Sequence, residues 1–226
     1  MKRISIAIDG PSGAGKSTMA KMLAKELGFV YVDTGAMYRA VGLYICRKGI
    51  DSKDRDSIVA ELPEIVVTIE YKDGEQRIIL NGEDVSGFIR NELIGRYASD
   101  CSALPEVRAH LLMLQRNMRE KADIIMDGRD IGTVVLPDAS LKIFLIADIE
   151  SRAKRRYDEL LQKGVEVTFE ETREQMEKRD MNDMNRAVAP LKAAEDAVTV
   201  DSTKMDIEET YRYILNIIRE RLGDVL

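Results

Sequence analysis

The first residues whose types and spacing could do chemistry lie in the glycine-rich segment 10–18, which reads GPSGAGKST. The segment fits the pattern G-x-x-x-x-G-K-[ST] of a phosphate-binding loop. Glycines let the backbone approach an anion closely, and successive N–H groups then point inward at the phosphate oxygens. The Lys16 ammonium can reach a β- or γ-phosphate, and the Ser17 hydroxyl can ligate Mg²⁺. The residues expected to hold a triphosphate are Gly10, Pro11, Ser12, Gly13, Ala14, Gly15, Lys16, Ser17 and Thr18.

The segments on either side of this loop have the patterns that a phosphate site requires. Residues 3–8 are a short β-branched run that predicts a buried strand. Met19, Leu23 and Leu27 then fall on one helical face, and Gly28 follows as a stop signal. The N-terminus of that helix would add partial positive charge behind the phosphates. The alternative interpretation is a glycine-rich turn in a Rossmann-type crossover.

Further polar residues follow two other predicted strands. The sequence DTG comes directly after strand 29–32, and Asp127 ends the apolar strand 122–127 in the manner of a Walker-B acid. Ligands bind at the carboxyl ends of strands in open α/β sheets. Arg129 follows Asp127 almost at once, where a guanidinium could meet phosphate oxygens.

Other arginines lie where an anionic acceptor could bind, namely Arg39, Arg179 and Arg186. For each of them taken alone, a solvated side chain is the favoured interpretation. Residues 150–186 are nearly balanced in charge, so a salt-bridged helix pair is the alternative there.

The predicted elements that must position these residues alternate between strand and helix. The strands are 3–8, 29–32, 122–127, 141–146 and 197–200. The helices are 16–27, 36–47, 52–62, one that Pro105 opens, 150–163, 169 to about 180, and a final helix that begins at the capping box of Asp206 and Glu209. This alternation predicts an α/β fold, with a parallel sheet flanked by helices.

One stretch departs from the alternation. Residues 65–71 and 76–80 read as two strands joined by an Asp-Gly turn, and Asn81-Gly82 turns the chain again. We therefore expect a small antiparallel insertion over residues 63–98.

Composition excludes several function classes. The chain has 226 residues and a net charge of −6, which argues against non-specific binding to nucleic acid. No apolar run reaches transmembrane length, and the first strand begins at once, so neither a membrane span nor a signal peptide is expected. Cys46 and Cys101 are expected to be reduced thiols of a cytoplasmic protein, and we expect a monomer. His110 has no partner at metal-ligand spacing, so a structural role is expected for it.

A phosphate loop alone permits an ATPase, a GTPase or a kinase. A GTPase needs a guanine-reading N-K-x-D sequence, which is absent. A motor or remodelling ATPase usually has further domains, for which 226 residues leave no room. A small-molecule kinase needs a second pocket rich in hydrogen-bond donors, which the arginines at the predicted strand ends could supply.

Five segments together resemble the bacterial cytidylate kinase family: 9–18, 33–39, 82–86, 127–135 and 185–191. The resemblance runs almost end to end. It implies the P-loop NTPase fold, with a kinase core of residues 1–62 and 99–226, a helical lid at about 150–168, and a nucleoside monophosphate-binding insertion at 63–98. It also implies γ-phosphoryl transfer from ATP to CMP and dCMP in pyrimidine nucleotide metabolism, with Mg²⁺ carried by ATP.

The resemblance also implies roles for individual residues. The catalytic residues would be Lys16, Arg129, Arg186 and Arg155. Arg152 and Arg156 would join the loop in binding ATP when the lid shuts. The residues on the CMP side would be Thr34, Tyr38, Arg39, Ser99, Arg108, Arg129, Asp130, Arg179, Asp183 and Arg186, of which Ser99, Arg108 and Asp130 would contact cytosine.

Two kinds of alternative stay open at this point. One is another small P-loop kinase, for uridylate, adenylate, shikimate or gluconate. The other is a nucleotide-dependent regulator, which no acceptor nucleotide would stimulate.

Overall fold

The computed structural model describes residues 3–72 and 74–223. The chain divides into two compact units. The first takes the described residues up to Tyr31 and from Ala122 onward, and the second is Val32–Lys121. The predicted insertion 63–98 lies within the second unit. Its role in binding a monophosphate stays a prediction.

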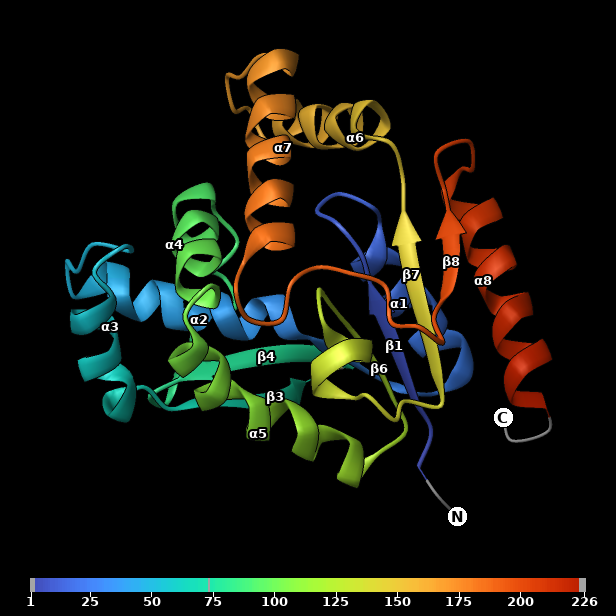
Figure 1. The fold of residues 1–226 in the computed structure, drawn as a ribbon, viewed down its shortest axis with the longest axis horizontal. Helices are drawn as coiled ribbons and strands as arrows, with labels where there is room; N and C mark the ends of the chain where they lie inside the picture. The colour runs from blue at the N-terminus through green and yellow to red at the C-terminus, as the bar shows by residue number, and fades with distance from the viewer. Residues whose placement is uncertain (1–2, 73, 224–226) are drawn as a thin grey trace. The chain divides into compact units, whose positions relative to one another are not determined.

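A five-stranded sheet is the frame of the first unit (Figure 1). Its strand order is β2-β6-β1-β7-β8, with β2 crossing the boundary between the units. The bounds are β1 Ser5–Asp9, β2 Val30–Asp33, β6 Ile124–Gly128, β7 Leu141–Ile146 and β8 Val198–Asp201. β1 pairs in parallel with β6 and β7, and β7 pairs in parallel with β8. The predicted parallel sheet flanked by helices is confirmed.

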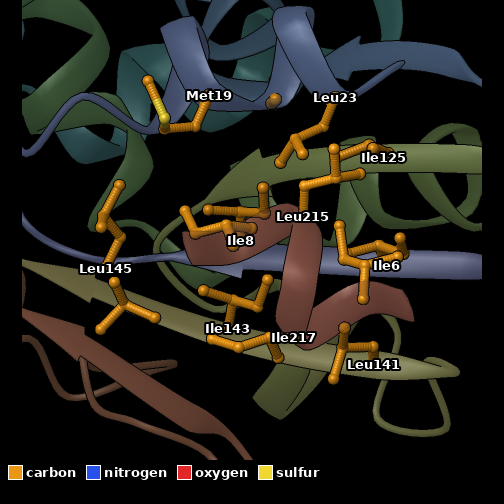
Figure 2. Packing of buried hydrophobic residues seen from close by; sticks show 14 of the residues in the cluster. Ile6, Ile8, Met19, Leu23, Ile125, Leu141, Ile143, Leu145, Leu215 and Ile217 are labelled. Atoms are coloured by element: carbon orange, nitrogen blue, oxygen red, sulfur yellow. The ribbon is translucent and has the colours of Figure 1, made fainter. Parts of the chain in front are cut away.

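The core of this unit forms between the sheet and two helices, α1 (Lys16–Leu27) and α8 (Ile207–Leu222). Figure 2 shows Met19 and Leu23 of α1 and Leu215 of α8 among the strand side chains. Leu23 and Ile8 are fully buried. Burying each aliphatic side chain of this size contributes roughly 1.5–3 kcal/mol, so the apolar face of α1 fixes the helix against β1. The predicted capping box of Asp206 and Glu209 is present at the start of α8.

The turn between β1 and α1 requires glycine. Gly10 has φ 148°, and a Cβ there would lie 2.0 Å from the carbonyl oxygen of Leu145. Gly15, at the N-cap of α1, has φ 90°, a conformation that L side chains rarely adopt. The loop can therefore approach β7 as closely as it does only because Gly10 has no side chain.

Two further helices of the first unit pack on each other, α6 (Ile149–Gln162) and α7 (Phe169–Asn185). The edge of one ring meets the face of the other between Tyr157 and Phe169, with centroids 6.1 Å apart. A capping box of Thr168 and Glu171 starts α7. The helix runs five residues beyond the predicted end near Asp180, because no glycine or proline interrupts the chain before Pro190. A π-helical turn, Ile131–Val135, was not predicted.

The second unit combines helices with a small antiparallel sheet, whose order is β3-β4-β5. Its elements are α2 (Thr34–Arg47), α3 (Arg55–Glu61), a 3₁₀ turn (Leu62–Glu64), β3 (Val67–Lys72), β4 (Glu75–Leu80), β5 (Glu83–Asp84), α4 (Glu92–Ser102) and α5 (Pro105–Lys121). The predicted hairpin is confirmed; of its turn residues, Asp73 lies outside the described residues. α3 begins three residues later than predicted because Asp54 caps it, accepting a hydrogen bond from the Ser57 N–H.

Helix α4 was not predicted, and its packing explains how it forms. α4 lies against α2, where Gly42 leaves room for it: a Cβ at Gly42 would lie 2.8 Å from the backbone nitrogen of Ala98. Local signals favour the same helix, because Asn91 caps it by accepting a hydrogen bond from the Ile94 N–H, and Ile94, Ala98 and Cys101 form a buried stripe along it.

Candidate active site

The phosphate loop connects β1 to α1, as predicted, and the side chain of Lys16 folds back over it. The Lys16 ammonium donates a hydrogen bond to the carbonyl oxygen of Pro11 at 2.6 Å, and the residue is 6% exposed. Burial lowers the pKa of Lys16 to about 7, and the charge of Arg129 acts in the same direction while Asp127 opposes it. Phosphate beside this ammonium would favour its charged form, because opposite charges raise the pKa of an amine.

Asp127 accepts two hydrogen bonds at the end of β6, one on each carboxylate oxygen. The Ser17 hydroxyl donates to Oδ2 at 2.8 Å, and the Tyr31 hydroxyl donates to Oδ1 at 2.9 Å. The predicted Walker-B acid therefore lies directly beside the predicted Mg²⁺ ligand. Tyr31 was not singled out from the sequence, because it lies inside strand β2 with no motif around it.

The Ser17 hydroxyl and the Asp127 carboxylate fit a magnesium ion that a nucleotide carries. Mg²⁺ takes hard oxygen ligands and usually keeps water and substrate phosphates as its other ligands, with one or two carboxylates from the protein. Within the described residues, no group of three or more acidic, histidine or cysteine side chains could hold a metal by itself. Ser17 and Asp127 could supply two oxygens to an ion that a nucleotide also ligates.

Four charged residues meet between the end of β6 and the end of α7, and we call them the arginine cluster: Arg129, Asp130, Asp183 and Arg186. The Arg129 Nε donates to an Asp183 oxygen at 2.8 Å. Arg186 lies 3.4 Å from Asp130 and 3.9 Å from Asp183, and its side chain is 5% exposed. The structure therefore brings together four of the predicted acceptor-site residues, which come from distant parts of the sequence.

The charges of the cluster stabilise one another. Burial by itself would raise the pKa of Asp183, but the guanidinium groups of Arg129, Arg179 and Arg186 hold it below its usual range. Burial likewise opposes the charge on Arg129, and Asp183 raises its pKa. Asp183 thus favours the charged form of Arg129, and the guanidinium groups of Arg129 and Arg186 could turn toward phosphate oxygens, which guanidinium groups match bidentately.

A strained turn fixes Arg186. Ala189 has φ 50°, which is rare for a residue with a side chain, and its carbonyl oxygen accepts a hydrogen bond from the Arg186 Nε. The Leu191 N–H donates to the carbonyl of Asp183 at 2.8 Å. The turn after α7 is therefore closed by its own backbone, which accounts for the strain at Ala189 and for the fixed position of Arg186.

The three arginines predicted for the lid have different surroundings. Arg152 is buried; its Nη1 donates to the Ser12 carbonyl at 3.0 Å and pairs with Asp180 at 2.5 Å. Arg155 donates to the Ser202 carbonyl at 3.1 Å, and Arg156 pairs with Glu159 on its own helix. Arg152 thus contacts the phosphate loop directly.

Asp180 was missed as a site residue, although it contacts the loop. One of its oxygens accepts a hydrogen bond from the Ser12 N–H at 3.3 Å while the other pairs with Arg152. The pattern of a charged helix offered no signal that could separate Asp180 from the other acids around it.

Five of the predicted CMP-side residues lie in the second unit, namely Thr34, Tyr38, Arg39, Ser99 and Arg108. Thr34 is buried at the start of α2, and the Arg108 guanidinium lies over the Tyr38 ring, 5.4 Å from its centroid. Arg108 also donates to the Ser102 carbonyl at 3.2 Å, and the Ser102 hydroxyl donates to the carbonyl of Ser99. The structure thus connects Ser99, Arg108 and Tyr38 through neighbouring contacts.

Arg39 has a separate set of contacts. Its Nη1 donates to the carbonyls of Ile89 and Asn91 at 3.0 and 3.3 Å, and a Cβ at Gly95 would lie 3.3 Å from it. These contacts join α2 to the segment that leads into α4. His110 lies on α5 with its Nε2 2.8 Å from the Ile65 carbonyl, a structural contact of the kind expected.

No helix within residues 3–72 and 74–223 is both long enough and apolar enough to cross a membrane.

Comparison with known proteins gives a consistent result. The family model described as Cytidylate kinase matches residues 6–220. A cytidylate kinase from Caldicellulosiruptor saccharolyticus is 48% identical over 224 residues, with 99% of each chain covered. One from Caldicellulosiruptor bescii is 51% identical over 217 residues, with 96% of each covered. One from Streptococcus pyogenes is 49% identical over 215 residues, with 95% of each covered.

Solved structures resemble this chain more distantly. An uncharacterized protein from Eubacterium ventriosum has a TM-score of 0.53 at 16% identity, over 97% of this chain and 100% of that one. A gluconokinase from Sinorhizobium meliloti has a TM-score of 0.50 at 13% identity, over 97% of this chain and 94% of that one. At such identities the likeness bears on the fold alone, which is that of the P-loop kinases.

Proposed function

Since this chain belongs to the cytidylate kinase family, we propose that it transfers the γ-phosphoryl group of ATP to CMP and to dCMP, giving CDP and dCDP. Family membership makes the chain a nucleoside monophosphate kinase that acts on CMP. ATP as the donor, dCMP as a second acceptor, and a place in cytoplasmic pyrimidine nucleotide metabolism as a monomer belong to the proposal.

The observation that carries the proposal is the arginine cluster in the unit that also holds the phosphate loop. Arg129 pairs with Asp183, which raises the pKa of Arg129, and Arg186 pairs with Asp130. A reaction between two polyanions needs such cations, because both nucleotides must have their phosphates neutralised before they can approach.

The acceptor chemistry explains why no general base is required. The nucleophile is an oxygen of the CMP phosphate, which is already anionic at neutral pH. Catalysis then rests on alignment of the two phosphates and on neutralisation of charge. Lys16 would bind the β- and γ-phosphates, while Arg129 and Arg186 would stabilise the transferring group.

Magnesium would be held by Ser17, with Asp127 beside it, and would neutralise phosphate charge when bound with ATP. Tyr31 and Ser17 hold the Asp127 carboxylate through its two oxygens, so its orientation is set before any nucleotide binds.

Base selection would depend on hydrogen-bond types, since cytosine and uracil have the same size. Cytosine presents an acceptor at N3 and an amine at position 4, whereas uracil presents a donor and a carbonyl. We assign Arg108 to N3, because guanidinium groups only donate, and Asp130 to the amine, because a carboxylate only accepts. Ser99 is assigned a further contact with the base. Thr34, Tyr38 and Arg39 would bind the CMP phosphate side, and Arg179 and Asp183 would lie near the acceptor sugar.

Water must be kept from the transferring phosphoryl group, or ATP would be hydrolysed. In the proposal, residues 150–168 close over the nucleotides and bring Arg152, Arg155 and Arg156 to ATP. The contact of Arg152 with the carbonyl of Ser12 supports the first of these roles.

The test is a coupled assay of ADP formation with a panel of acceptors: CMP, dCMP, UMP, AMP, shikimate and gluconate. CMP should give the highest kcat/KM, with dCMP next to it. A preference for UMP, AMP or a non-nucleotide acceptor would contradict the proposal. Nucleotide binding that no acceptor turns into ADP formation would instead indicate a regulator.

A further inference from the structure

A buried carboxylate that was not among the predicted site residues lies next to the phosphate loop and contacts the segment that follows Arg129 and Asp130. Asp9 is the last residue of β1, directly before Gly10 of the phosphate loop, and it is 5% exposed. Its Oδ1 accepts a hydrogen bond from the Ile131 N–H at 2.8 Å, and its Oδ2 accepts one from the Gly132 N–H at 2.7 Å. Both donors follow Arg129 and Asp130 directly in the chain.

These two hydrogen bonds lie directly beyond the end of the pairing between β1 and β6. In the parallel ladder of β1 and β6, the last paired residues are Asp9 and Gly128. Beyond Gly128 the chain leaves the sheet, and its backbone returns to β1 at Ile131 and Gly132, which donate to the Asp9 carboxylate. Arg129 and Asp130 lie between the ladder and these contacts, so Asp9 fixes the backbone directly after that dipeptide.

Packing around the contact leaves it little freedom. A Cβ at Gly132 would lie 3.0 Å from the Lys142 side chain and 3.4 Å from the Asp9 Oδ2. Lys142 is itself buried and pairs with Asp196 at 2.8 Å. Gly132 is therefore closely packed between the side chains of Lys142 and Asp9.

Burying the charged form of this carboxylate costs free energy. Burial raises the pKa of Asp9 to about 6 and Asp130 adds to this, while the two backbone N–H groups and Lys16 oppose it. A neutral side chain would cost less to bury. Asparagine has one acceptor oxygen and an NH₂ group in place of the second, so in the position of the carboxylate it would accept one N–H and turn its NH₂ donors against the other. A carboxylate satisfies both.

We propose that Asp9 is a positioning residue of phosphoryl transfer: by holding the backbone at Ile131 and Gly132, it sets the positions of Arg129 and Asp130 relative to the phosphate loop. The inference rests on the proposed roles of Arg129 and Asp130. In this role Asp9 acts through Arg129 and Asp130 rather than on the phosphates directly. Its loss should therefore lower kcat, while the KM for ATP changes little.

The chain offers a matched control at the opposite end of the same two strands. There the Asp123 Oδ1 accepts a hydrogen bond from the Ile4 N–H at 2.8 Å, again connecting β1 to the β6 segment through a carboxylate. Asp123→Asn makes the same substitution far along the strands from Arg129, where the asparagine oxygen can still accept the Ile4 N–H, so it reports the effect of losing a carboxylate charge at a strand end alone.

The experiment compares wild type, Asp9→Asn, Asp9→Glu and Asp123→Asn for kcat, KM and amide hydrogen exchange at residues 129–132. Asp9→Asn should lower kcat by about 10-fold to 100-fold, the size of effect expected from a misplaced catalytic group, and should speed exchange at Ile131 and Gly132. Asp123→Asn should keep kcat within about twofold of wild type. Asp9→Glu keeps both acceptors but displaces the segment by one methylene, so it should fold and still lose kcat.

A double substitution separates positioning from general structure. If Asp9 acts through Arg129, adding Asp9→Asn to Arg129→Met should cost little beyond Arg129→Met alone. Two independent losses that multiply would overturn the inference, as would wild-type kcat in Asp9→Glu. Unchanged amide exchange at residues 129–132 in Asp9→Asn would overturn the inference, whether or not the protein phosphorylates CMP. If the wild type is inactive on CMP but exchange is faster in Asp9→Asn, only the proposed function is contradicted.

Discussion

At the scale of single residues, the site is a set of buried charges whose partners are all within the protein. Lys16 bonds to a loop carbonyl, Arg129 pairs with Asp183, and Arg152 pairs with Asp180. Each cation therefore has a defined partner within the protein, which limits the number of positions it can take. Replacing one of them should affect the chemical step more than the fold.

The first prediction concerns Lys16. Lys16→Ala should lower kcat by about 100-fold to 1,000-fold, the range found when one donor to developing charge is removed. Lys25→Ala, an exposed lysine in the last turn of the same helix, should keep wild-type turnover. Steady-state kinetics with circular dichroism checks both variants. Normal turnover in a folded Lys16→Ala protein would contradict the assignment of the phosphate loop.

The second prediction concerns the base. Uracil would leave buried groups unpaired at Arg108 and Asp130, at a cost of about 1–3 kcal/mol each. Wild type should therefore prefer CMP over UMP by roughly 10-fold to 100-fold in kcat/KM. Arg108→Met and Asp130→Ala should each erode this ratio mainly by losing activity on CMP.

The ratio is the informative quantity for Asp130, because this residue also pairs with Arg186. Loss of that pair should lower turnover of every monophosphate equally and leave the ratio alone. A CMP/UMP ratio that is the same in wild type and both variants would show that neither side chain reads the base.

The third prediction concerns pH. The pKa of Asp9 is about 6 in the folded chain and 3.8 for an ordinary aspartate, so in this window the folded state binds more protons than the unfolded state. The free energy of unfolding contributed by Asp9 should therefore fall as pH rises from about 4 to 6, by up to about 3 kcal/mol.

The difference in unfolding free energy between wild type and Asp9→Asn isolates this effect, because the other titrating groups are common to both proteins. Denaturant unfolding at pH 4, 5, 6 and 7 measures it. The groups that face Asp9 with charge are Asp130 and Lys16. A difference that stays constant, or that moves in favour of wild type as pH rises, would contradict burial as the dominant cause.

At the scale of elements, α6 and α7 connect the phosphate loop to the arginine cluster. α6 supplies Arg152, and α7 supplies Asp180 near its middle and Asp183 at its end. Because α7 contacts the phosphate loop and also carries part of the arginine cluster, a change at one contact should alter the geometry of the other.

The fourth prediction concerns the lid. Amide hydrogen exchange in residues 150–168 should slow when ATP and CMP sites are both filled by a bisubstrate mimic, because closure would protect this segment. Residues 207–222 of α8 serve as the internal control and should exchange at an unchanged rate. Equal exchange of residues 150–168 with and without the mimic would favour a static salt-bridged helix pair.

At the scale of the whole molecule, the predicted site residues are divided between two compact units. The phosphate loop and the arginine cluster belong to the first, and Thr34, Tyr38, Arg39, Ser99 and Arg108 belong to the second. Each set is joined by contacts within its own unit. Binding of a nucleotide to either set should stabilise the folded chain by mass action.

The fifth prediction uses that stabilisation to test the role of Mg²⁺. ATP at about 100 times its Kd should raise the free energy of unfolding by about 2.7 kcal/mol, and chelation of Mg²⁺ by EDTA should reduce the effect. Mg²⁺ without nucleotide should have no effect, since Ser17 and Asp127 would hold only an ion that ATP also ligates. Thermal shift assays measure all three conditions. Stabilisation by Mg²⁺ alone would instead indicate a resident metal site.

Sequence alone determined the features that depend on local rules. The glycine loop, the capping box of α8 and the strand 141–146 follow from steric freedom, hydrogen-bond caps and apolar runs, which neighbouring residues dictate. Residues in such motifs could be assigned chemistry because the motif fixes their local geometry. The resemblance to a family added roles that spacing could not supply.

Only the tertiary structure decided which distant charges meet. Arg129 and Asp183 are 54 positions apart, and Asp9 and Ile131 are 122 apart. Their contacts depend on the order of strands in the sheet and on where α7 ends, which no local pattern encodes. The same holds for Asp180, which is one acid among many on a charged helix until the fold brings it to Ser12. Burial then gives these contacts their energy, because a charge that loses water must find its partner inside the protein.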